Sequence, residues 1–193
     1  MGMEIRKGKV SLSKELTDLD RFVLDVVGLI EEFFPYVIVS GYVTILFGRS
    51  RGTEDIDIVI PEVEKEKFEK LCREAIKRGF EFINPENCEG LYEMLEERMA
   101  IRMARMGEII PNAEIKFPKD AFHRDALEKK IPVRLNDNTI YISPIELQIA
   151  YKLYLGSDKD IEDAFFLYEL FREVIEWGVL KEYAGRLGVE IPF

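Results

Sequence analysis

An acidic strand between residues 55 and 60 constrains the fold of this chain more than any other feature. Its side chains alternate, so that Asp55 and Asp57 lie on one face and isoleucines lie on the other. Residues 36–40 also read as a strand, followed by a glycine, a short apolar helix at 43–47 and a polar turn. This order predicts an α/β domain with two neighbouring carboxylates on one face of its sheet.

Further helices and strands are predicted on both sides of this segment. Apolar residues recur at helical spacing after Thr17, which can cap a helix, and again over residues 68–78. Residues 91–95 read as irregular or helical. Five further segments read as strands: 80–83, 101–105, 113–117 and the two arms of a hairpin, 131–135 and 139–142. We therefore expect a mixed β-sheet flanked by helices.

The C-terminal part is predicted to be helical. Residues 143–146 match a capping box with proline at the first helical position. Ser157 can cap a second helix, and a last helix is expected over residues 174–187. We therefore divide the chain into an α/β domain at 1–142 and a C-terminal helical region at 143–193 that packs on it.

Composition and charge limit the classes of function. The formal net charge of −10 works against a broad nucleic-acid-binding surface, because such surfaces neutralise phosphates with many basic side chains. Cys72 and Cys88 match neither a zinc motif nor a disulfide framework. Residues 1–10 lack the apolar core of a signal peptide, and no apolar run approaches the roughly 20 residues that span a bilayer. We expect a soluble, cytoplasmic protein with no membrane partner.

Charged residues are abundant along the chain. They make up 33% of it and Gln148 is the only glutamine, a balance often seen in thermophile proteins. A nucleic-acid substrate would need a local basic patch, for which six residues are candidates: Arg98, Arg102, Arg105, Lys116, Lys119 and Arg124. The alternative, a solvated charged face, is the commoner outcome for such residues.

Residues 40–57 combine two features that phosphate chemistry needs. Gly41 permits close backbone approach to a phosphate, and the start of the following helix offers unpaired N–H groups. Asp55 and Asp57 offer the oxygen ligands that Mg²⁺ or Mn²⁺ takes. Glu114 is the candidate third carboxylate of a two-metal site. The alternative is that these three residues are ordinary turn or surface acids.

These residues resemble the polymerase-β-like nucleotidyltransferases, and among them the AbiEii-type nucleotidyltransferases of toxin–antitoxin pairs. The family's first motif, a glycine pair, a small residue, a later glycine and R-x-T-x-D-x-D, is similar here to Gly41, Thr44, Gly48, Arg51, Thr53, Asp55 and Asp57. The family's third acid is similar to Glu114, and its later motifs are similar to Lys152, Lys159, Asp160 and Asp163. The resemblance covers most of the chain and implies a nucleotidyltransferase-type mixed sheet with a C-terminal helical region.

The resemblance also implies an activity. It is the transfer of a nucleoside monophosphate from an NTP to a hydroxyl acceptor, either an RNA end such as that of a tRNA or a protein. The implied catalytic residues are Asp55, Asp57, Glu114 and Asp160, of which the first three hold Mg²⁺ or Mn²⁺. The implied nucleotide-binding residues are Ser40, Gly41, Tyr42, Arg51, Thr53 and Lys152. An antitoxin protein is the implied partner.

Two departures from the family pattern motivate an alternative function. Tyr42 stands where the opening pair has a second glycine or serine, and its bulk would reshape the nucleotide seat. Glu114 stands where aspartate is usual. The alternative is a catalytically impaired protein that binds nucleotide for regulation or binds a partner.

Four side chains have more than one interpretation. Lys152 either reaches a nucleotide phosphate or lies on the surface. Asp160 orients Lys152, acts as a base or complements the dipole of a helix start. Tyr42 either stacks on a base or packs inward. His123, the only histidine, is expected at the surface because no partner ligands accompany it.

Overall fold

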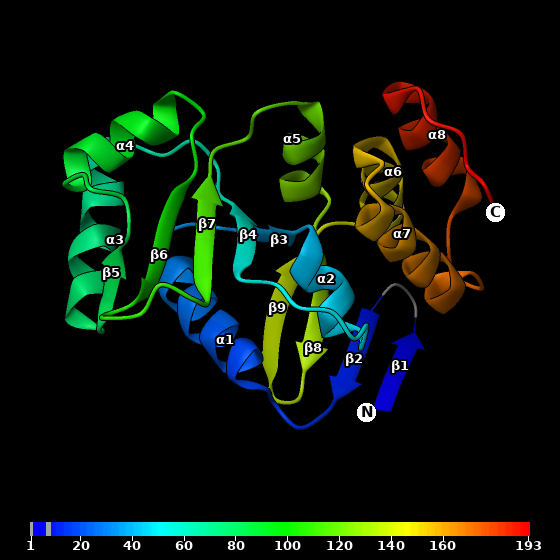
Figure 1. The fold of residues 1–193 in the computed structure, drawn as a ribbon, viewed down its shortest axis with the longest axis horizontal. Coiled ribbons are helices and arrows are strands. Elements are labelled where there is room, and N and C mark those ends of the chain that lie inside the picture. The colour runs from blue at the N-terminus through cyan, green and yellow to red at the C-terminus, as the bar shows by residue number, and fades with distance from the viewer. Residues whose placement is uncertain (1, 7–8) are drawn as a thin grey trace.

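The computed structural model describes residues 2–6 and 9–193, which form a mixed β-sheet flanked by helices (Figure 1). Within these residues the sheet has nine strands in the order β1-β2-β8-β9-β3-β4-β7-β6-β5. The strands are β1 (Gly2–Arg6), β2 (Lys9–Ser13), β3 (Val37–Val39), β4 (Asp55–Val59), β5 (Phe80–Phe82), β6 (Ile101–Arg105), β7 (Asn112–Lys116), β8 (Ile131–Leu135) and β9 (Asn138–Ile142). The helices are α1 (Asp18–Glu31), α2 (Gly41–Leu46), α3 (Lys65–Lys77), α4 (Cys88–Glu96), α5 (Ala121–Glu128), α6 (Ile145–Leu155), α7 (Asp158–Phe171) and α8 (Trp177–Leu187).

The sheet consists of two groups of strands joined by a narrow connection. In one group, β4 pairs antiparallel with β3 and parallel with β7, and β6 and β5 follow. In the other, the β8–β9 hairpin pairs in parallel with β2 of the N-terminal hairpin. The groups meet where Ile38 pairs with Ile142, and the Ser143 N–H donates to the Ile38 carbonyl at 3.0 Å. The helical region therefore begins beside the end of β3.

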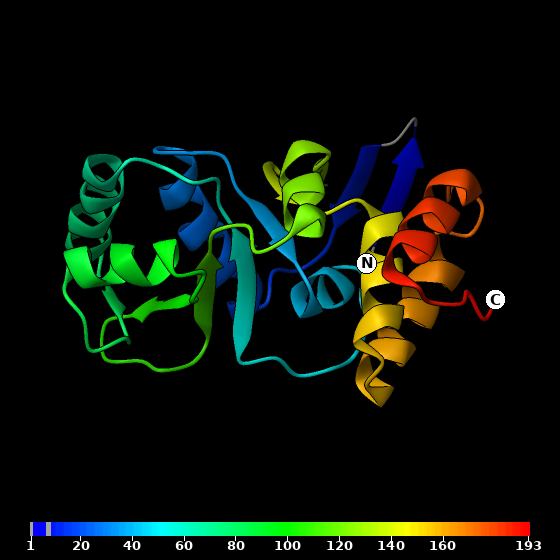
Figure 2. The same cartoon turned by 90° about the horizontal axis from the view of Figure 1, so that it is seen from above.

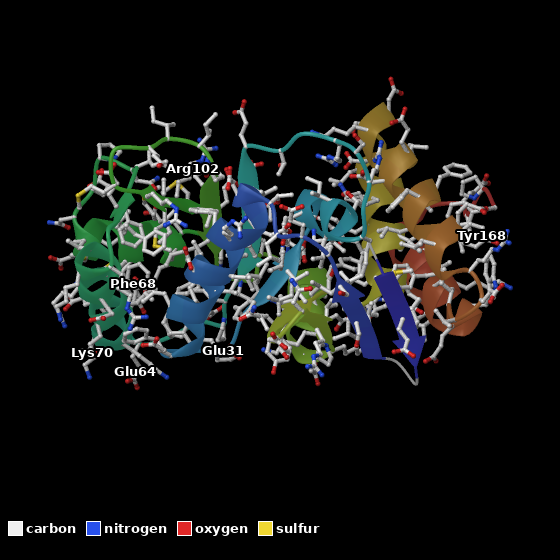
Figure 3. All side chains as sticks on the ribbon, turned by 90° about the horizontal axis from the view of Figure 1, so that it is seen from below. Glu31, Glu64, Phe68, Lys70, Arg102 and Tyr168 are labelled. Atoms are coloured by element: carbon white, nitrogen blue, oxygen red, sulfur yellow. The ribbon has the colours of Figure 1, made fainter. Side chains whose placement is uncertain are left out.

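Helices gather at both ends of the molecule. α6, α7 and α8 lie at one end, and α3 and α4 lie at the other, with β4 and β7 between them (Figure 2). Figure 3 shows this separation through Tyr168 on α7 and Phe68 on α3, which lie at opposite ends. The short helix α2 reaches α7 through the rings of Phe47 and Phe171, whose centroids are 4.9 Å apart. The strands that carry the acids thus lie between two helical groups.

The α/β class, with its mixed sheet and C-terminal helices, is confirmed. The acidic strand forms as β4, and its Ile56 and Ile58 are buried in the core. The N-terminal hairpin, in which β1 and β2 pair antiparallel, is not among the predicted elements. No helix in the described part of the chain is long and apolar enough to cross a membrane. The segment inspected for a signal peptide includes residues 1, 7 and 8, which lie outside the described residues.

The predicted capping box at residues 143–146 is wrong. The helix begins at Ile145, after Pro144, and has no side-chain cap. The Ser143 hydroxyl donates instead to Oε1 of Gln148 at 2.8 Å, and Glu146 accepts from the backbone N–H of Glu176 at 3.0 Å. Both side chains serve tertiary contacts, which here outweigh their local preference for capping a helix.

Candidate active site

Asp55, Asp57 and Glu114 lie on one face of two adjacent strands. The parallel register of β4 and β7 sets Asp57 beside Glu114 and Asp55 beside Asn112. Because side chains alternate along both strands, the three acids point to the same side of the sheet. The side chains of Asp57 and Glu114 are 19% and 17% exposed. The structure thus brings together the three predicted carboxylates from segments far apart in the sequence.

Basic side chains hold two of these carboxylates. Lys116 lies two residues beyond Glu114 on β7, and its Nζ is 2.5 Å from Oδ1 of Asp57. Arg102, on the neighbouring strand β6, pairs with Glu114 through Nη2 and Oε1 at 2.6 Å. Positive charges therefore stand where the sequence predicts metal ions.

The donor set fits one divalent cation better than a centre with three carboxylates. Asp55 and Asp57 offer oxygens side by side, and Mg²⁺ is commonly held by one or two carboxylates together with substrate phosphates. The Thr53 hydroxyl lies 3.1 Å from Oδ1 of Asp55 and donates to it. No group of three His, Cys, Asp or Glu residues within the described chain is placed to hold a metal ion. Metal ligation by Glu114 stays a prediction.

The turn between β3 and α2 has a strained backbone at Ser40. Its φ of 65° and ψ of −137° lie in a region that favours glycine. Gln148 of α6 makes two hydrogen bonds to the backbone of this residue. Its Nε2 donates to the Ser40 carbonyl at 2.7 Å, and its Oε1 accepts from the Ser40 N–H at 3.3 Å. Ser143 donates to the same Oε1. A side-chain amide from the helical region therefore holds the turn.

We expect Gln148→Leu to lower the free energy of unfolding by about 1–3 kcal/mol, because the part-buried backbone groups of Ser40 and the buried hydroxyl of Ser143 lose their partner. NTP affinity should fall as well, since the turn loses its support. Thermal melting and calorimetric titration with NTP measure the two effects. Ser143→Ala removes one of the three hydrogen bonds and should have a clearly smaller effect on both. An unchanged melting temperature of Gln148→Leu would contradict this role.

Ser40 and Gly41, rather than Gly41 and Tyr42, form the small-residue pair of this turn. Ser40 has the positive φ, and Gly41 begins α2. The Tyr42 side chain is 0% exposed, and its hydroxyl donates to Oδ1 of Asp20 at 2.8 Å. Tyr42 thus packs inward, and the reshaping of the nucleotide seat expected from its bulk does not arise. A nucleotide could touch its backbone alone.

Arg51 lies over the start of α2 and pairs with a buried carboxylate of α7. A Cβ at position 41 would lie 3.0 Å from a guanidinium nitrogen of Arg51, so the glycine makes room for this side chain. The guanidinium pairs with Asp163, which is 0% exposed and which also pairs with Arg49 and Lys152. Because α2 has six residues, its dipole adds little, and the Arg51 guanidinium is the positive group that lies against Gly41.

The Arg51 charge also acts on the acidic strand. Burial and the neighbouring Arg49 lower the pKa of the Arg51 guanidinium, whereas Asp160 and Asp55 raise it. Arg51 pairs with Asp163 of α7 and lies two residues before Thr53, whose hydroxyl donates to Asp55.

Lys152 and Asp160 form a largely buried ion pair. Their Nζ–Oδ1 distance is 2.7 Å, and the Lys152 side chain is 3% exposed, so it is not a surface lysine. Burial lowers the pKa of Lys152, against the raising effect of Asp160. Burial alone would raise the pKa of Asp160, but hydrogen bonds from Lys152 and Ser157 lower it overall. A carboxylate with a lowered pKa is a weak proton acceptor, so the geometry favours Asp160 as the residue that orients Lys152.

Asp160 is expected to make the stability of the protein sensitive to acid. Its pKa in the folded protein lies below the ordinary value of 3.8, so its contribution is present above that value and is lost as the pH falls through the folded pKa. The wild type should therefore lose more stability than Asp160→Asn between about pH 7 and about pH 3. Melting temperatures across this range test it, with the exposed neighbour Asp158→Asn as control. Equal losses in wild type and Asp160→Asn would contradict the assignment.

Most of the predicted basic patch is neutralised within the protein. Lys116 and Arg102 hold the acids of the sheet, and Arg98 and Arg105 pair with Glu62 at 2.7 Å and Asp25 at 2.5 Å. This pairing favours a salt-bridged face over a phosphate-binding surface.

His123 is covered rather than exposed, contrary to expectation. Its side chain is 11% exposed, and Nδ1 lies 2.8 Å from Oδ1 of Asp120 at the start of α5. Its ring also meets Tyr151 edge-on, with centroids 6.1 Å apart. The histidine therefore serves a local packing contact.

Comparisons with known proteins identify solved structures of similar fold. No protein-family model matches the sequence, and no curated protein is significantly similar to it. An antigenic nucleotidyltransferase-like protein from Paracoccidioides brasiliensis is 20% identical with a TM-score of 0.52, over 86% of this chain and 85% of that one. ANT(2'')-Ia in complex with adenylyl-2''-tobramycin is 13% identical with a TM-score of 0.50, over 88% and 99%. The solution structure of the antibiotic-resistance factor ANT(2'')-Ia is 12% identical with a TM-score of 0.51, over 89% and 93%. The chain therefore has the fold of the nucleotidyltransferase-like proteins.

Proposed function

We propose that this protein is a metal-dependent nucleotidyltransferase that transfers a nucleoside monophosphate from an NTP to a hydroxyl acceptor. The observation that carries the proposal is the register of β4 and β7, which sets Asp55, Asp57 and Glu114 on one face of the sheet. The phosphates would lie at the turn overlain by Arg51; the position of the Arg51 guanidinium over Gly41 and the contact of the nearby Thr53 with Asp55 support this placement. The fold shared with nucleotidyltransferase-like proteins supports the same activity.

In the proposed reaction the acceptor oxygen attacks the α-phosphorus and pyrophosphate leaves, as the bond from that phosphorus to the α,β-bridging oxygen breaks. The hydroxyl proton passes to solvent or to a carboxylate of β4. Asp55 and Asp57 would hold Mg²⁺ or Mn²⁺, which supplies a Lewis acid for the phosphates. Arg51 stabilises the charge that develops on the phosphate oxygens. Lys152, oriented by Asp160, adds positive charge on the side of the helices.

The proposed acceptor is an RNA end, such as that of a tRNA, or a protein hydroxyl. The net charge of −10 and the internal pairing of Arg98 and Arg105 favour a protein over an extended RNA surface. One fold neighbour is described in complex with adenylyl-2''-tobramycin, so small polyhydroxyl compounds belong in any acceptor screen. The AbiEii-type resemblance motivates a toxin role with an antitoxin partner. A cytoplasmic location is proposed from the cysteine content, and a thermophilic source from the many charged residues and the single glutamine.

The alternative is a nucleotide-binding regulatory or partner-binding protein with impaired catalysis. The pairing of Asp57 with Lys116 and of Glu114 with Arg102 favours it, because both carboxylates already have a positive partner. Tyr42 no longer supports it, because its side chain packs inward.

The test is Mg²⁺-dependent transfer of α-labelled NTPs to total RNA, total protein and small polyhydroxyl compounds. Wild type is compared with Asp57→Asn and with Glu62→Gln, which changes a mostly exposed acid away from the site. We expect label in one acceptor class with wild type and Glu62→Gln, and none with Asp57→Asn. NTP binding without transfer to any acceptor would favour the regulatory alternative. Absence of metal-dependent NTP binding would contradict both.

A further inference from the structure

The carboxylate face carries its own positive charges. Asp55, Asp57 and Glu114 contribute three negative charges, and Lys116 and Arg102 contribute two positive ones, which leaves one net negative charge. Within the described residues Asp55 has no ion-pair partner and accepts from the Thr53 hydroxyl. The charge available to a divalent cation is therefore much smaller than the three acids alone would provide.

Lys116 is placed by the sheet itself. It sits on β7 in register with Val59 of β4, on the same face as Glu114. Its side chain is 13% exposed and ends 2.5 Å from Oδ1 of Asp57. An ammonium group on a flexible stem usually extends into water, because it is strongly hydrated. Here it lies along the sheet and covers the carboxylate that the proposed metal needs.

We propose that Lys116 is a built-in counter-cation at the metal site, which competes with a divalent ion for Asp57 in the nucleotide-free protein. The proposal rests on the proposed function, because it takes Asp55 and Asp57 as the metal ligands. Two cations a few ångströms apart at a partly buried site repel each other strongly. A metal at Asp57 must therefore displace the Lys116 ammonium. Free protein binds metal weakly, and the phosphates of an NTP favour metal binding by adding ligands and accepting the displaced ammonium.

The test is Mn²⁺ binding measured by the electron paramagnetic resonance signal of free Mn²⁺, without any turnover. Lys116→Met should lower the Mn²⁺ dissociation constant of nucleotide-free protein about tenfold or more, because the competing charge is gone. Lys116→Arg keeps the charge and should bind Mn²⁺ about as weakly as wild type. Lys119→Met removes the same charge from an exposed position on the following loop and is the matched control. Its dissociation constant should change by about twofold at most, because exposed charges are screened.

A non-hydrolysable NTP provides the second measurement. It should raise the Mn²⁺ affinity of wild type by a larger factor than that of Lys116→Met, whose site is already free of the competing charge. An unchanged Mn²⁺ dissociation constant in folded Lys116→Met would overturn the proposal. So would a Lys116→Met variant that loses NTP affinity while its metal affinity stays the same, because Lys116 would then act on the nucleotide alone. Lys116→Gln repeats the test if the methionine variant fails to fold.

These outcomes separate this inference from the proposed activity. If wild type transfers nucleotide but Lys116→Met binds Mn²⁺ no better, the counter-cation fails and the activity stands. If Lys116→Met gains metal affinity but wild type transfers no nucleotide, the counter-cation stands and the activity fails.

Discussion

Replacing Asp163 with alanine is expected to lower the free energy of unfolding by about 3–5 kcal/mol, because it leaves buried positive charge without a partner. Its carboxylate is 0% exposed and pairs with Arg49, Arg51 and Lys152. For a chain of this size the melting temperature should fall by about 6–20 °C. Thermal unfolding followed by circular dichroism measures this loss.

Glu162→Ala is the matched control for this prediction. Glu162 pairs with Arg49 at 2.5 Å, but its side chain is 71% exposed, so its loss should cost less than about 1 kcal/mol. If Asp163→Ala melted as Glu162→Ala does, the buried cluster would not hold α7 to the turn. The ion pair with Asp163 would then not be what holds the Arg51 side chain over Gly41.

Asp57→Asn should lower nucleotidyl transfer about a thousandfold or more, because removing a metal ligand costs several kcal/mol of transition-state stabilisation. The fold should survive, because asparagine keeps the shape of the side chain and the lost Lys116–Asp57 pair is only part-buried. Rates of label transfer and melting temperatures measure the two effects.

Glu114→Gln tests whether two or three carboxylates bind the metal. Because Arg102 engages Glu114, we expect a loss of about tenfold, the scale of an indirect contact to a metal ligand. A loss as large as that of Asp57→Asn would contradict the two-carboxylate seat. Such a loss would mean that the Glu114 carboxylate leaves Arg102 and binds the metal when nucleotide is present.

Local patterns predicted the elements that carry the site. The alternation of residues 55–58 predicts the strand that forms as β4, because Ile56 and Ile58 enter the core while Asp55 and Asp57 lie on the other face. Ser157 was correctly assigned as a cap, and its side chain accepts from the Asp160 N–H. The mistaken capping box at 143–146 has a tertiary cause, since Gln148 recruits Ser143 to hold the turn at Ser40.

Partners across the sheet could not be predicted from the sequence. The pairing of Lys116 with Asp57 depends on the register of β4 and β7, and that of Arg102 with Glu114 on the register of β6 and β7. The first register joins strands far apart in the chain, and packing sets it. The second joins two consecutive strands, but their pairing partners depend on the loop between them, whose conformation the sequence pattern does not give. The sequence pattern also does not show that Gln148 holds the backbone of Ser40, because the two residues lie far apart in the chain. The one available signal is that Gln148 is the only glutamine.

The most direct test of the central claim compares α-labelled with γ-labelled NTP in the presence of Mg²⁺ and the acceptor fraction. Nucleotidyl transfer predicts that the α label enters the acceptor, while the γ label is released as pyrophosphate in equal amount, and that chelation of the metal stops both. Entry of the γ label into the acceptor would show phosphoryl transfer instead and would contradict the proposed function.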